Sequence, residues 1–246
     1  MGFKDHFSGH AREYQRHRPR YPAALAAHVA SLAPVRGLAL DLATGNGQAA
    51  LDLAAHFALV CASDASASQL AHAHEHPRVR YLRHRAERLP YRDGYVDLVA
   101  SAQAAHWFDF APFHAEVRRV LRPGGLCALW TYEKFRVEPA LDACVDAFYR
   151  DVIGPYWPPE RRHVEQAYRS LPFPYAEIPA PPFELVTEWR LPQVLDYLGT
   201  WSAVQRYRSA TGADPLPALA ARLAEIAGDD APLRLRWPIH LRIGRT

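Results

Sequence analysis

Between residues 38 and 131, apolar runs of four to six residues recur and alternate with polar turns and segments of helical periodicity. Runs this short, each followed by a helical segment, predict buried strands that pair in parallel through right-handed crossovers. The predicted strands are 38–42, 58–62, 79–82, 96–101 and 126–131, and the predicted helices are 22–33, 48–56, 66–76 and 113–121. Such a sheet is covered on both faces and binds ligands at the carboxyl ends of its strands.

The distribution of proline predicts a change of architecture near Thr131. Seven of the 21 prolines lie in residues 1–130 and fourteen in residues 131–246. Because proline interrupts helices and sheet ladders, we expect the second part of the chain to be less regular. It still contains two segments that alternate as strands do and two helical stretches, namely 183–191, 233–243, 192–208 and 217–227.

These patterns predict an α/β fold: a doubly wound, mostly parallel seven-stranded sheet with an antiparallel edge strand and an inserted substrate lid. We expect a single domain over residues 1–246. Within it, we expect a ligand-binding βα core at 30–131, the lid at 132–182, and returning edge strands and helices at 183–246.

Charge and hydropathy argue against several classes of protein. A net charge of +3 is too small to indicate a nucleic-acid partner, because phosphate binding needs clustered cations. No apolar run approaches the roughly 18 residues of a membrane span, and the opening MGFKDHFSGH is too polar for a secretory signal. The three cysteines, Cys61, Cys127 and Cys144, are widely spaced. We therefore expect reduced, buried thiols in a cytoplasmic protein.

The turn after the first predicted strand contains Gly45 and Gly47, and Asp41 precedes them at the end of the strand. With Ala50 and with Asp64, nineteen residues after Gly45, this turn also fits the dinucleotide-binding fingerprint, and an ordinary glycine turn is the structural alternative. The carboxylate of Asp41 would repel a pyrophosphate but attract a cationic amino acid. A ligand that joins a cationic amino acid to adenosine is S-adenosylmethionine (SAM).

The sequence resembles the class I SAM-dependent methyltransferases in several segments that occur in the same order. They are 41–47 (DLATGNG), the acid Asp64, 86–90 (AERLP) and 121–125 (LRPGG). Three further segments, at 14–22, 103–109 (QAAHWFD) and 200–203 (TWSA), are similar to the type 11 subgroup that includes trans-aconitate methyltransferase-like proteins. The resemblance implies methyl transfer from SAM to a small-molecule acceptor, for which a carboxylate is one candidate.

The resemblance also implies which residues bind SAM. Asp41 would lie near the amino group of SAM and Asp64 at the ribose hydroxyls. Ala86 and Glu87 would meet the adenine, and Gln103 would lie beside the methionine portion or the methyl group. The complete set of implied cofactor-binding residues is Asp41, Ala43, Thr44, Gly45, Gly47, Asp64, Ala86, Glu87, Gln103, Tyr14 and Arg18. The structural alternatives are an incidental carboxylate at Asp41 or Asp64 and a helix-docking arm at 14–22.

Two positions depart from the family pattern. Ala43 stands where relatives have the first glycine of the motif, which is tolerable if its φ is negative. Arg85 stands where many relatives have an acid, so the adenine amino group would have to be contacted by Glu87 or by backbone.

His106 is the candidate catalytic residue, because a histidine after the fourth strand can titrate near neutrality. A packing histidine is the alternative, and an already ionised carboxylate acceptor would need His106 only for orientation. We expect an acceptor pocket walled by aromatic side chains. They are Trp107, Trp130, Tyr132, Trp157 and Trp201. The cations Arg161, Arg162 and Arg206 could pair with an acidic acceptor.

The sequence is also compatible with other functions. A nicotinamide-dependent reductase has a similar fold, and a SAM-binding or RNA-associated module would lack turnover. His72, His74 and His76 resemble metal ligands in composition, but on a helix only the first and third share a face, so we expect no metal site. The six arginines within 78–92 indicate a solvent-exposed edge of the protein.

Overall fold

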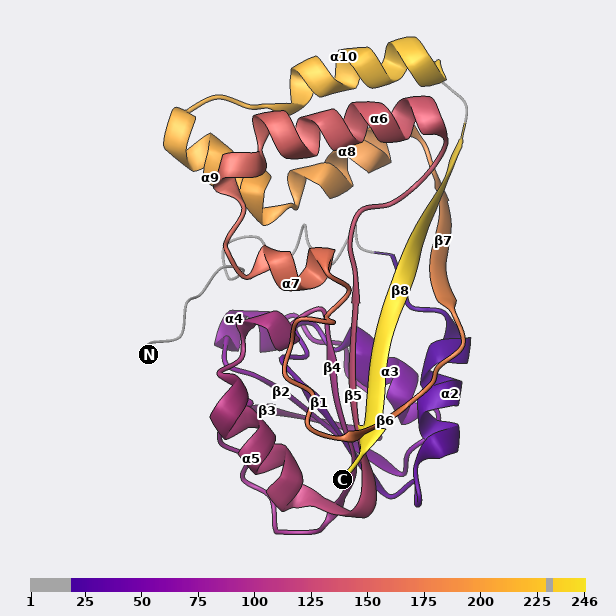
Figure 1. Cartoon of the computed structure of the whole chain (residues 1–246), viewed down its shortest axis with the longest axis vertical. Helices are drawn as coiled ribbons and strands as arrows, with labels where there is room; N and C mark the ends of the chain where they lie inside the picture. Colours follow the sequence, from indigo (N-terminus) through magenta and orange to yellow (C-terminus); the bar gives the residue numbers. More distant parts are fainter. Residues whose placement is uncertain (1–18, 229–231) are drawn as a thin grey trace.

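The computed structural model describes residues 19–228 and 232–246. Its centre is an eight-stranded sheet in the order β3-β2-β1-β4-β5-β8-β6, with β7 also paired to β8 (Figure 1). The strands are β1 (Leu38–Leu42), β2 (Leu59–Asp64), β3 (Val79–Arg83), β4 (Val96–Ala102), β5 (Leu121–Tyr132), β6 (Ala176–Ile178), β7 (Phe183–Trp189) and β8 (Leu233–Arg245). β1 to β5 pair in parallel, whereas β8 runs antiparallel to β5, β6 and β7. The predicted mostly parallel sheet is thus confirmed.

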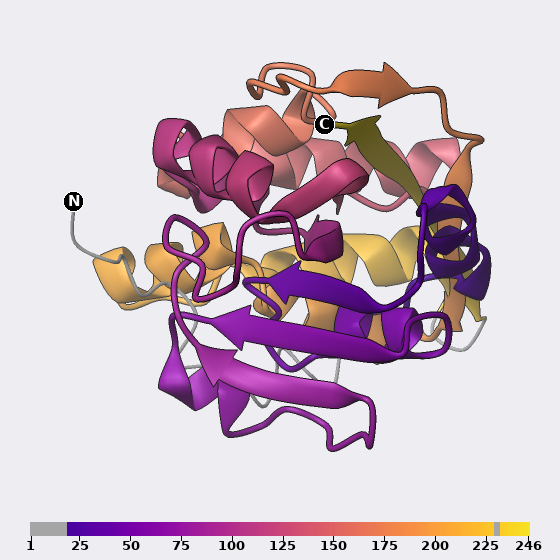
Figure 2. The same ribbon diagram turned by 90° about the horizontal axis from the view of Figure 1, so that it is seen from below.

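Helices cover both faces of this sheet and, in the view of Figure 1, its upper end. They are α2 (Ala23–Leu32), α3 (Gln48–Ala54), α4 (Ala67–Leu70), α5 (Phe110–Val120), α6 (Pro139–Ala147), α7 (Arg161–Glu165), α8 (Leu191–Gly199), α9 (Ser202–Thr211) and α10 (Leu216–Ala227), with the shorter turns η2 (Ala105–Trp107), η3 (Phe148–Val152) and η4 (Gly154–Tyr156). Seen from below, β3, β2 and β1 lie side by side at one edge, and β8 lies on the opposite side of the sheet (Figure 2).

Alternation along the strands produces two hydrophobic cores. On β5, Leu126, Ala128 and Trp130 belong to the core that includes α2 and α3, whereas Cys127 and Leu129 belong to the core that includes α5. Successive side chains of a strand point to opposite faces, so a central strand that is apolar throughout must be covered on both. This explains why β1 is buried at all five of its residues.

The carboxyl ends of the parallel strands face a layer of helices formed by α6, α8, α9 and α10, here called the helical cap (Figure 1). Within the cap, α10 packs against α6 and α8. The cap therefore draws on both the 132–182 and the 183–246 segments. Helix α7 lies between the cap and the sheet (Figure 1).

Several predicted elements differ from the observed ones. The helix expected at 66–76 is limited to α4, because the His74 N–H donates to the Asn46 carbonyl (3.3 Å) instead of continuing the helix. The helical stretch expected at 192–208 is divided into α8 and α9 around Thr200 and Trp201. The sheet has eight strands rather than seven, since the three-residue β6 carries no clear alternation in the sequence.

Candidate active site

The glycine turn after β1 brings together most of the residues predicted to bind the cofactor. Ala43, Gly45 and Gly47 all have positive φ, at 53°, 59° and 88°. The chain turns sharply here because the Thr44 N–H donates to the Ser63 carbonyl of β2 (2.9 Å). The negative φ expected for Ala43 is therefore wrong. A residue with a Cβ is held in the left-handed region, at a cost of about 1 kcal/mol.

Asp41 lies wholly buried at the end of β1. One carboxylate oxygen, Oδ2, accepts a hydrogen bond from Thr44 Oγ1 at 2.5 Å. The other, Oδ1, has no hydrogen-bond partner among the described residues. Burial raises the pKa of Asp41 to about 7, and the neighbouring carboxylates of Asp64 and Asp52 add to this shift. In the described part of the chain Oδ1 lacks a hydrogen-bond donor, and the carboxyl group titrates near neutral pH. A cationic ligand group would supply the missing donor and stabilise the ionised form.

Asp64, at the end of β2, supports the same turn. Its Oδ2 accepts from the Gly45 N–H (2.9 Å) and its Oδ1 from the Ser66 N–H (2.8 Å). The carboxylate therefore connects the glycine turn to the start of α4. A carboxylate oxygen can accept more than one hydrogen bond.

Gly47 is required by its neighbour Tyr81 on β3. A Cβ at Gly47 would lie 2.1 Å from the Tyr81 hydroxyl oxygen, well inside contact distance. That hydroxyl donates to the His74 carbonyl (2.8 Å) and so fixes the segment after α4. Tyr81 was not predicted from the sequence, where it reads only as an ordinary strand residue.

The 86–90 segment, predicted at the adenine side, is fastened to α5. Ala86 is buried, and Glu87 Oε1 accepts from the Asp109 N–H at 3.0 Å. The Glu87 side chain thus contacts the backbone at the start of α5, and Arg85 is exposed. Backbone atoms of 86–90 are consequently held in a fixed position relative to β4 and α5.

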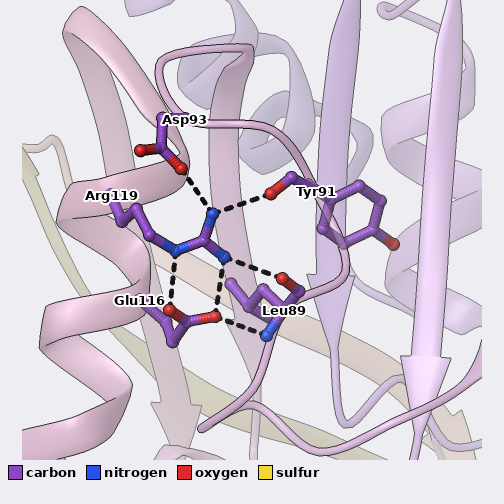
Figure 3. Close-up of polar contacts among 5 residues, drawn as sticks. All are labelled: Leu89, Tyr91, Asp93, Glu116 and Arg119. Carbon is purple, nitrogen blue, oxygen red and sulfur yellow. Dashed lines mark hydrogen bonds and ion pairs between the residues drawn. The ribbon is translucent and has the colours of Figure 1, made fainter.

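Arg119 and Glu116 of α5 fasten the loop that follows (Figure 3). Arg119 donates to the carbonyl oxygens of Leu89 and Tyr91, at 2.8 Å each, and to Asp93 Oδ1 at 2.7 Å. Glu116 Oε2 accepts from the Leu89 N–H at 2.6 Å, and both Glu116 oxygens bind Arg119. Hydrogen bonding to Arg119 lowers the pKa of Glu116. These contacts satisfy buried backbone groups that the loop cannot pair internally.

Gln103, just after β4, has its side-chain amide bonded to the end of β5. Its Nε2 donates to the Tyr132 carbonyl (2.8 Å), while Oε1 accepts from the Tyr132 N–H (3.2 Å) and from the Thr131 hydroxyl. The residue has a φ of 57°, unusual outside glycine. Gln103 also lines the cavity described next, so it lies between the predicted cofactor residues and that cavity.

A small cavity of about 60 Å³ lies between the strand ends and the helical cap. It is lined by Gln103, His106, Trp107, Glu133, Trp157, Pro158, Arg161, Val164, Tyr197, Trp201 and Ser202. Three predicted pocket residues, Trp107, Trp157 and Trp201, are thus brought together. The other lining residues, including Tyr197 and Glu133, were not predicted, because an aromatic-rich segment does not show which side chains converge.

Two predicted pocket residues, Trp130 and Tyr132, lie outside this cavity. Both are 3% exposed and belong to the core on the α2 and α3 side of β5. The centroids of their rings lie 5.8 Å and 6.2 Å from the ring centroid of Tyr21. Their position at a strand end was predicted, but the alternation along β5 turns them away from the cavity.

His106 is placed on the cavity wall by η2, and its Nδ1 lies 2.9 Å from the Tyr168 hydroxyl. Burial, together with the positive charges of Arg161 and His163, lowers the pKa of His106 to about 3. The expectation that His106 titrates near neutrality is therefore wrong. At neutral pH it is an uncharged imidazole and a weak base.

Arg161 supplies a positive charge to the cavity. Its Nε donates to the Tyr149 hydroxyl (2.9 Å), and its guanidinium lies 4.6 Å from the ring centroid of Trp157. In the part of the chain that the structure covers, no carboxylate forms an ion pair with it. Of the other predicted cations, Arg162 is exposed, and neither it nor Arg206 lines the cavity.

Tyr14 and Arg18 lie outside the described residues. Within 19–228 and 232–246, no group of three or more His, Cys, Asp or Glu side chains could hold a metal ion. The same ranges contain no helix of the length and apolarity needed to cross a bilayer.

Comparison with known proteins identifies the family of this chain. The methyltransferase domain family matches residues 40–129. A solved structure from Anaeromyxobacter dehalogenans, described as a type II methyltransferase, is 48% identical with a TM-score of 0.87, covering 93% of this chain and 97% of that one. The chain belongs to the class I SAM-dependent methyltransferases.

Two further proteins are similar to this chain in sequence or in fold. A methyltransferase of Dictyostelium discoideum is 28% identical over 99% of this chain and 95% of its own. A phosphoethanolamine N-methyltransferase of Haemonchus contortus, solved with S-adenosylhomocysteine, shares the fold at 16% identity and a TM-score of 0.50, covering all of this chain and 61% of that one. The reductase and the non-catalytic module are set aside by the family membership.

SAM is the methyl donor of this methyltransferase. When bound, it supplies an electrophilic methyl group on a positively charged sulfur. The residues present fit such a ligand, because the orphaned oxygen of Asp41 suits its ammonium group. The family match ends at residue 129, before Glu133, Trp157, Arg161 and Trp201 of the cavity, so membership alone does not identify the acceptor.

Proposed function

We propose that this methyltransferase transfers the methyl group of SAM to a carboxylate oxygen of a small-molecule acceptor, as its resemblance to the trans-aconitate methyltransferase-like subgroup implies. The observation that carries the proposal is the guanidinium of Arg161 on the cavity wall, without a carboxylate partner in the described chain. A partly desolvated cation that lacks an ion pair favours a ligand that brings the opposite charge.

The surroundings of Arg161 orient it for that task. The Tyr149 hydroxyl binds Nε, which leaves the outer guanidinium nitrogens for a ligand. The Trp157 ring lies against its face and limits rotation. Guanidinium and carboxylate match as two parallel hydrogen bonds, which gives geometric selectivity besides affinity.

We propose the following arrangement for the cofactor. Asp41 binds the amino group and Asp64 the ribose hydroxyls. Ala86 and Glu87 border the adenine, where the Asp109 contact leaves one Glu87 oxygen available. The remaining residues of the set, on the glycine turn, at Gln103 and in the 14–22 segment, complete the site as expected from the sequence.

The arrangement requires little acid or base chemistry. An ionised carboxylate attacks the methyl carbon directly: the new C–O bond forms as the C–S bond breaks, and the electron pair stays on the sulfur. No proton has to leave, in agreement with the lowered pKa of His106. Catalysis then depends on alignment and exclusion of water, which the three indole rings of the cavity support.

We further propose that the chain forms a single domain, with 30–131 as the SAM-binding core and 132–182 as a lid over the acceptor. The position of Arg161 and Trp157 on the cavity wall, both from the 132–182 segment, supports the second assignment.

The decisive experiment incubates the protein with methyl-labelled SAM and a panel of small mono-, di- and tricarboxylic acids, with amines and phenols of similar size for comparison. We expect acid-dependent formation of methyl esters. Arg161→Gln should raise the KM for the acid about 10- to 100-fold, since a charged hydrogen bond is worth about 1.5 to 3 kcal/mol. Arg162→Gln, an exposed neighbour on α7, is the matched control. Methylation of amines or phenols but not of acids would overturn the proposal.

A further inference from the structure

Tyr168 occupies a constrained position beside the cavity. It follows α7 in a turn where two successive residues other than glycine, Ala167 and Tyr168, have positive φ (55° and 60°). Its side chain is wholly buried. Its N–H donates to the His163 carbonyl (2.8 Å), and its carbonyl accepts from Arg242 of β8 (3.0 Å). Such backbone conformations persist only where the surroundings enforce them, and they gather at functional sites.

Arg242 connects this turn to the sheet. Its guanidinium also donates to the Leu171 carbonyl (2.9 Å), and it forms two hydrogen bonds of 3.0 Å with the carboxylate of Glu177 on β6. The ring of Phe173 lies 4.5 Å from the guanidinium carbon. Tyr168 is therefore fixed relative to β8, independently of the contact that its own hydroxyl makes.

The Tyr168 hydroxyl lies 2.9 Å from Nδ1 of His106, and its neighbours determine the direction of this hydrogen bond. Thr131 donates its proton to Gln103 Oε1. The Thr131 hydroxyl therefore has no proton left for Tyr168, and Nδ1 of His106 is the hydrogen-bond partner of the Tyr168 hydroxyl among the described residues. If Nδ1 were the donor, the proton of this buried phenol would have no acceptor in the described part of the chain, which is unfavourable, so the phenol donates. Nδ1 is the acceptor.

This direction determines the state of His106. A neutral imidazole that accepts at Nδ1 carries its proton on Nε2. Nε2 makes no hydrogen bond within the described residues, and the residue lines the acceptor cavity. We propose that Tyr168 is a positioning residue: by donating to Nδ1, it holds His106 as a neutral imidazole that presents Nε2–H to the acceptor. This inference rests on the proposed function for the acceptor's chemical class.

The same structural unit carries both groups that would bind a carboxylate. Arg161 begins α7 and Tyr168 follows its end, so one short segment sets the cation and the orientation of His106. One acceptor oxygen would face the guanidinium and the neighbouring oxygen the Nε2–H. His106 thus binds and orients the acceptor and does not remove a proton from it.

The tautomer of His106 is measured by long-range ¹⁵N–¹H correlation spectra of the histidine side chains with S-adenosylhomocysteine added, between pH 6 and 8. The signal that disappears in His106→Gln identifies the residue. We expect the Nε2-protonated neutral form in the native protein. In Tyr168→Phe we expect the other tautomer to appear and the pKa of His106 to rise, because the neutral ring has lost its donor.

Kinetics supply the second arm, with Tyr175→Phe as the matched control. Tyr175 makes the same kind of contact, 2.7 Å from Nδ1 of His114, but away from the cavity. With the best acid from the panel, Tyr168→Phe should lower kcat/KM about tenfold, and Tyr175→Phe less than twofold.

Each outcome decides the matter. An Nδ1-protonated His106 in the native protein overturns the inference, and this measurement needs no known acceptor and no Tyr168 variant. Equal kinetic losses in the two Tyr→Phe variants also overturn it, because they would show a merely structural role. If no acid is methylated, the proposed function fails, while the tautomer still reports on Tyr168.

Discussion

Asp41 and Thr44 share a single hydrogen bond at the end of β1, in which the threonine hydroxyl donates to Oδ2 at 2.5 Å and leaves Oδ1 without a partner in the described chain. This one contact does not compensate the burial of the carboxylate, and the pKa of Asp41 is raised to about 7. The protein alone therefore stabilises the ionised form of this carboxylate poorly. Binding of a cationic group at Oδ1 recovers the cost of ionising Asp41.

The raised pKa predicts how stability depends on pH. Folding favours the protonated form of Asp41, so its contribution is full below about pH 4 and is lost as pH rises through about 7. At pH 8, Asp41→Asn should raise the free energy of unfolding of the ligand-free protein by roughly 1 to 4 kcal/mol, with a smaller gain at pH 5. Urea unfolding at the two pH values measures this difference.

The same variant should bind S-adenosylhomocysteine at least tenfold more weakly in calorimetric titration. More stable without ligand but weaker in binding is a combination that a purely structural carboxylate would not produce. A variant that loses stability at pH 8 would contradict both the assignment of Asp41 and the direction of its pKa shift.

Asp64 offers a second test of the cofactor site. Asp64→Asn retains one oxygen for a backbone N–H but loses the charge that would attract the ribose hydroxyls. We expect S-adenosylhomocysteine to bind about tenfold more weakly, in line with about 1.5 kcal/mol for a charged acceptor. Glu75→Gln, which alters an exposed carboxylate nearby, should leave affinity unchanged. Unchanged affinity in Asp64→Asn would remove Asp64 from the site.

Gly47 and Tyr81 should be coupled energetically. Gly47→Ala introduces both an unfavourable φ and a clash with the Tyr81 hydroxyl, whereas Gly94→Ala, at a φ of 62° with open space around it, introduces only the first. We expect Gly47→Ala to be the more destabilising by at least about 1 kcal/mol. Adding Tyr81→Phe to Gly47→Ala should recover part of this difference in a double-mutant cycle. Additive effects would contradict the clash.

Arg119 should contribute to cofactor binding at a distance, through the loop that it fastens. Arg119→Met removes the donors for the Leu89 and Tyr91 carbonyls and releases Glu116. We expect a loss of about 2 kcal/mol in thermal or urea unfolding, since partly buried backbone acceptors lose their partners. We also expect weaker binding of S-adenosylhomocysteine. Arg92→Met, at an exposed position of the same loop, should change neither quantity.

The sequence contained enough information for the parallel core of this fold and for the placement of the candidate cofactor residues at its strand ends. Short apolar runs determine strands, and a carboxylate before a glycine turn must lie at the carboxyl end of β1 whatever the rest of the chain does. Asp41, Gly45, Gly47 and Asp64 consequently meet as predicted. The φ of Ala43 could not be predicted, because it follows from the hydrogen bond between Thr44 and Ser63 on a neighbouring strand.

The cavity was less predictable, since it depends on how distant segments pack. Trp130 and Trp157 were both predicted to line the pocket because they are aromatic. The side chain of Trp130 points from β5 into the core, whereas Trp157 lines the cavity. The environment of His106 likewise depends on Tyr168, 62 residues further along the chain. A histidine that follows a strand end can be predicted from the sequence to act as a general base. Only the burial around it shows that its pKa lies far below neutrality.

The lowered pKa of His106 leads to the last prediction. Its folded-state value of about 3 lies below the ordinary 6.5, so its contribution to stability is present above about pH 6.5 and is lost as pH falls below that value. Because the pKa of about 3 lies below this range, His106 stays neutral between pH 5.5 and 8. With saturating SAM and a carboxylic acid acceptor, kcat/KM should show no inflection from His106 over the same range. His106→Gln keeps an N–H donor and should retain activity within about tenfold, whereas His106→Ala should lose more. An inflection near pH 6.5 that disappears in His106→Gln would instead identify His106 as a general base.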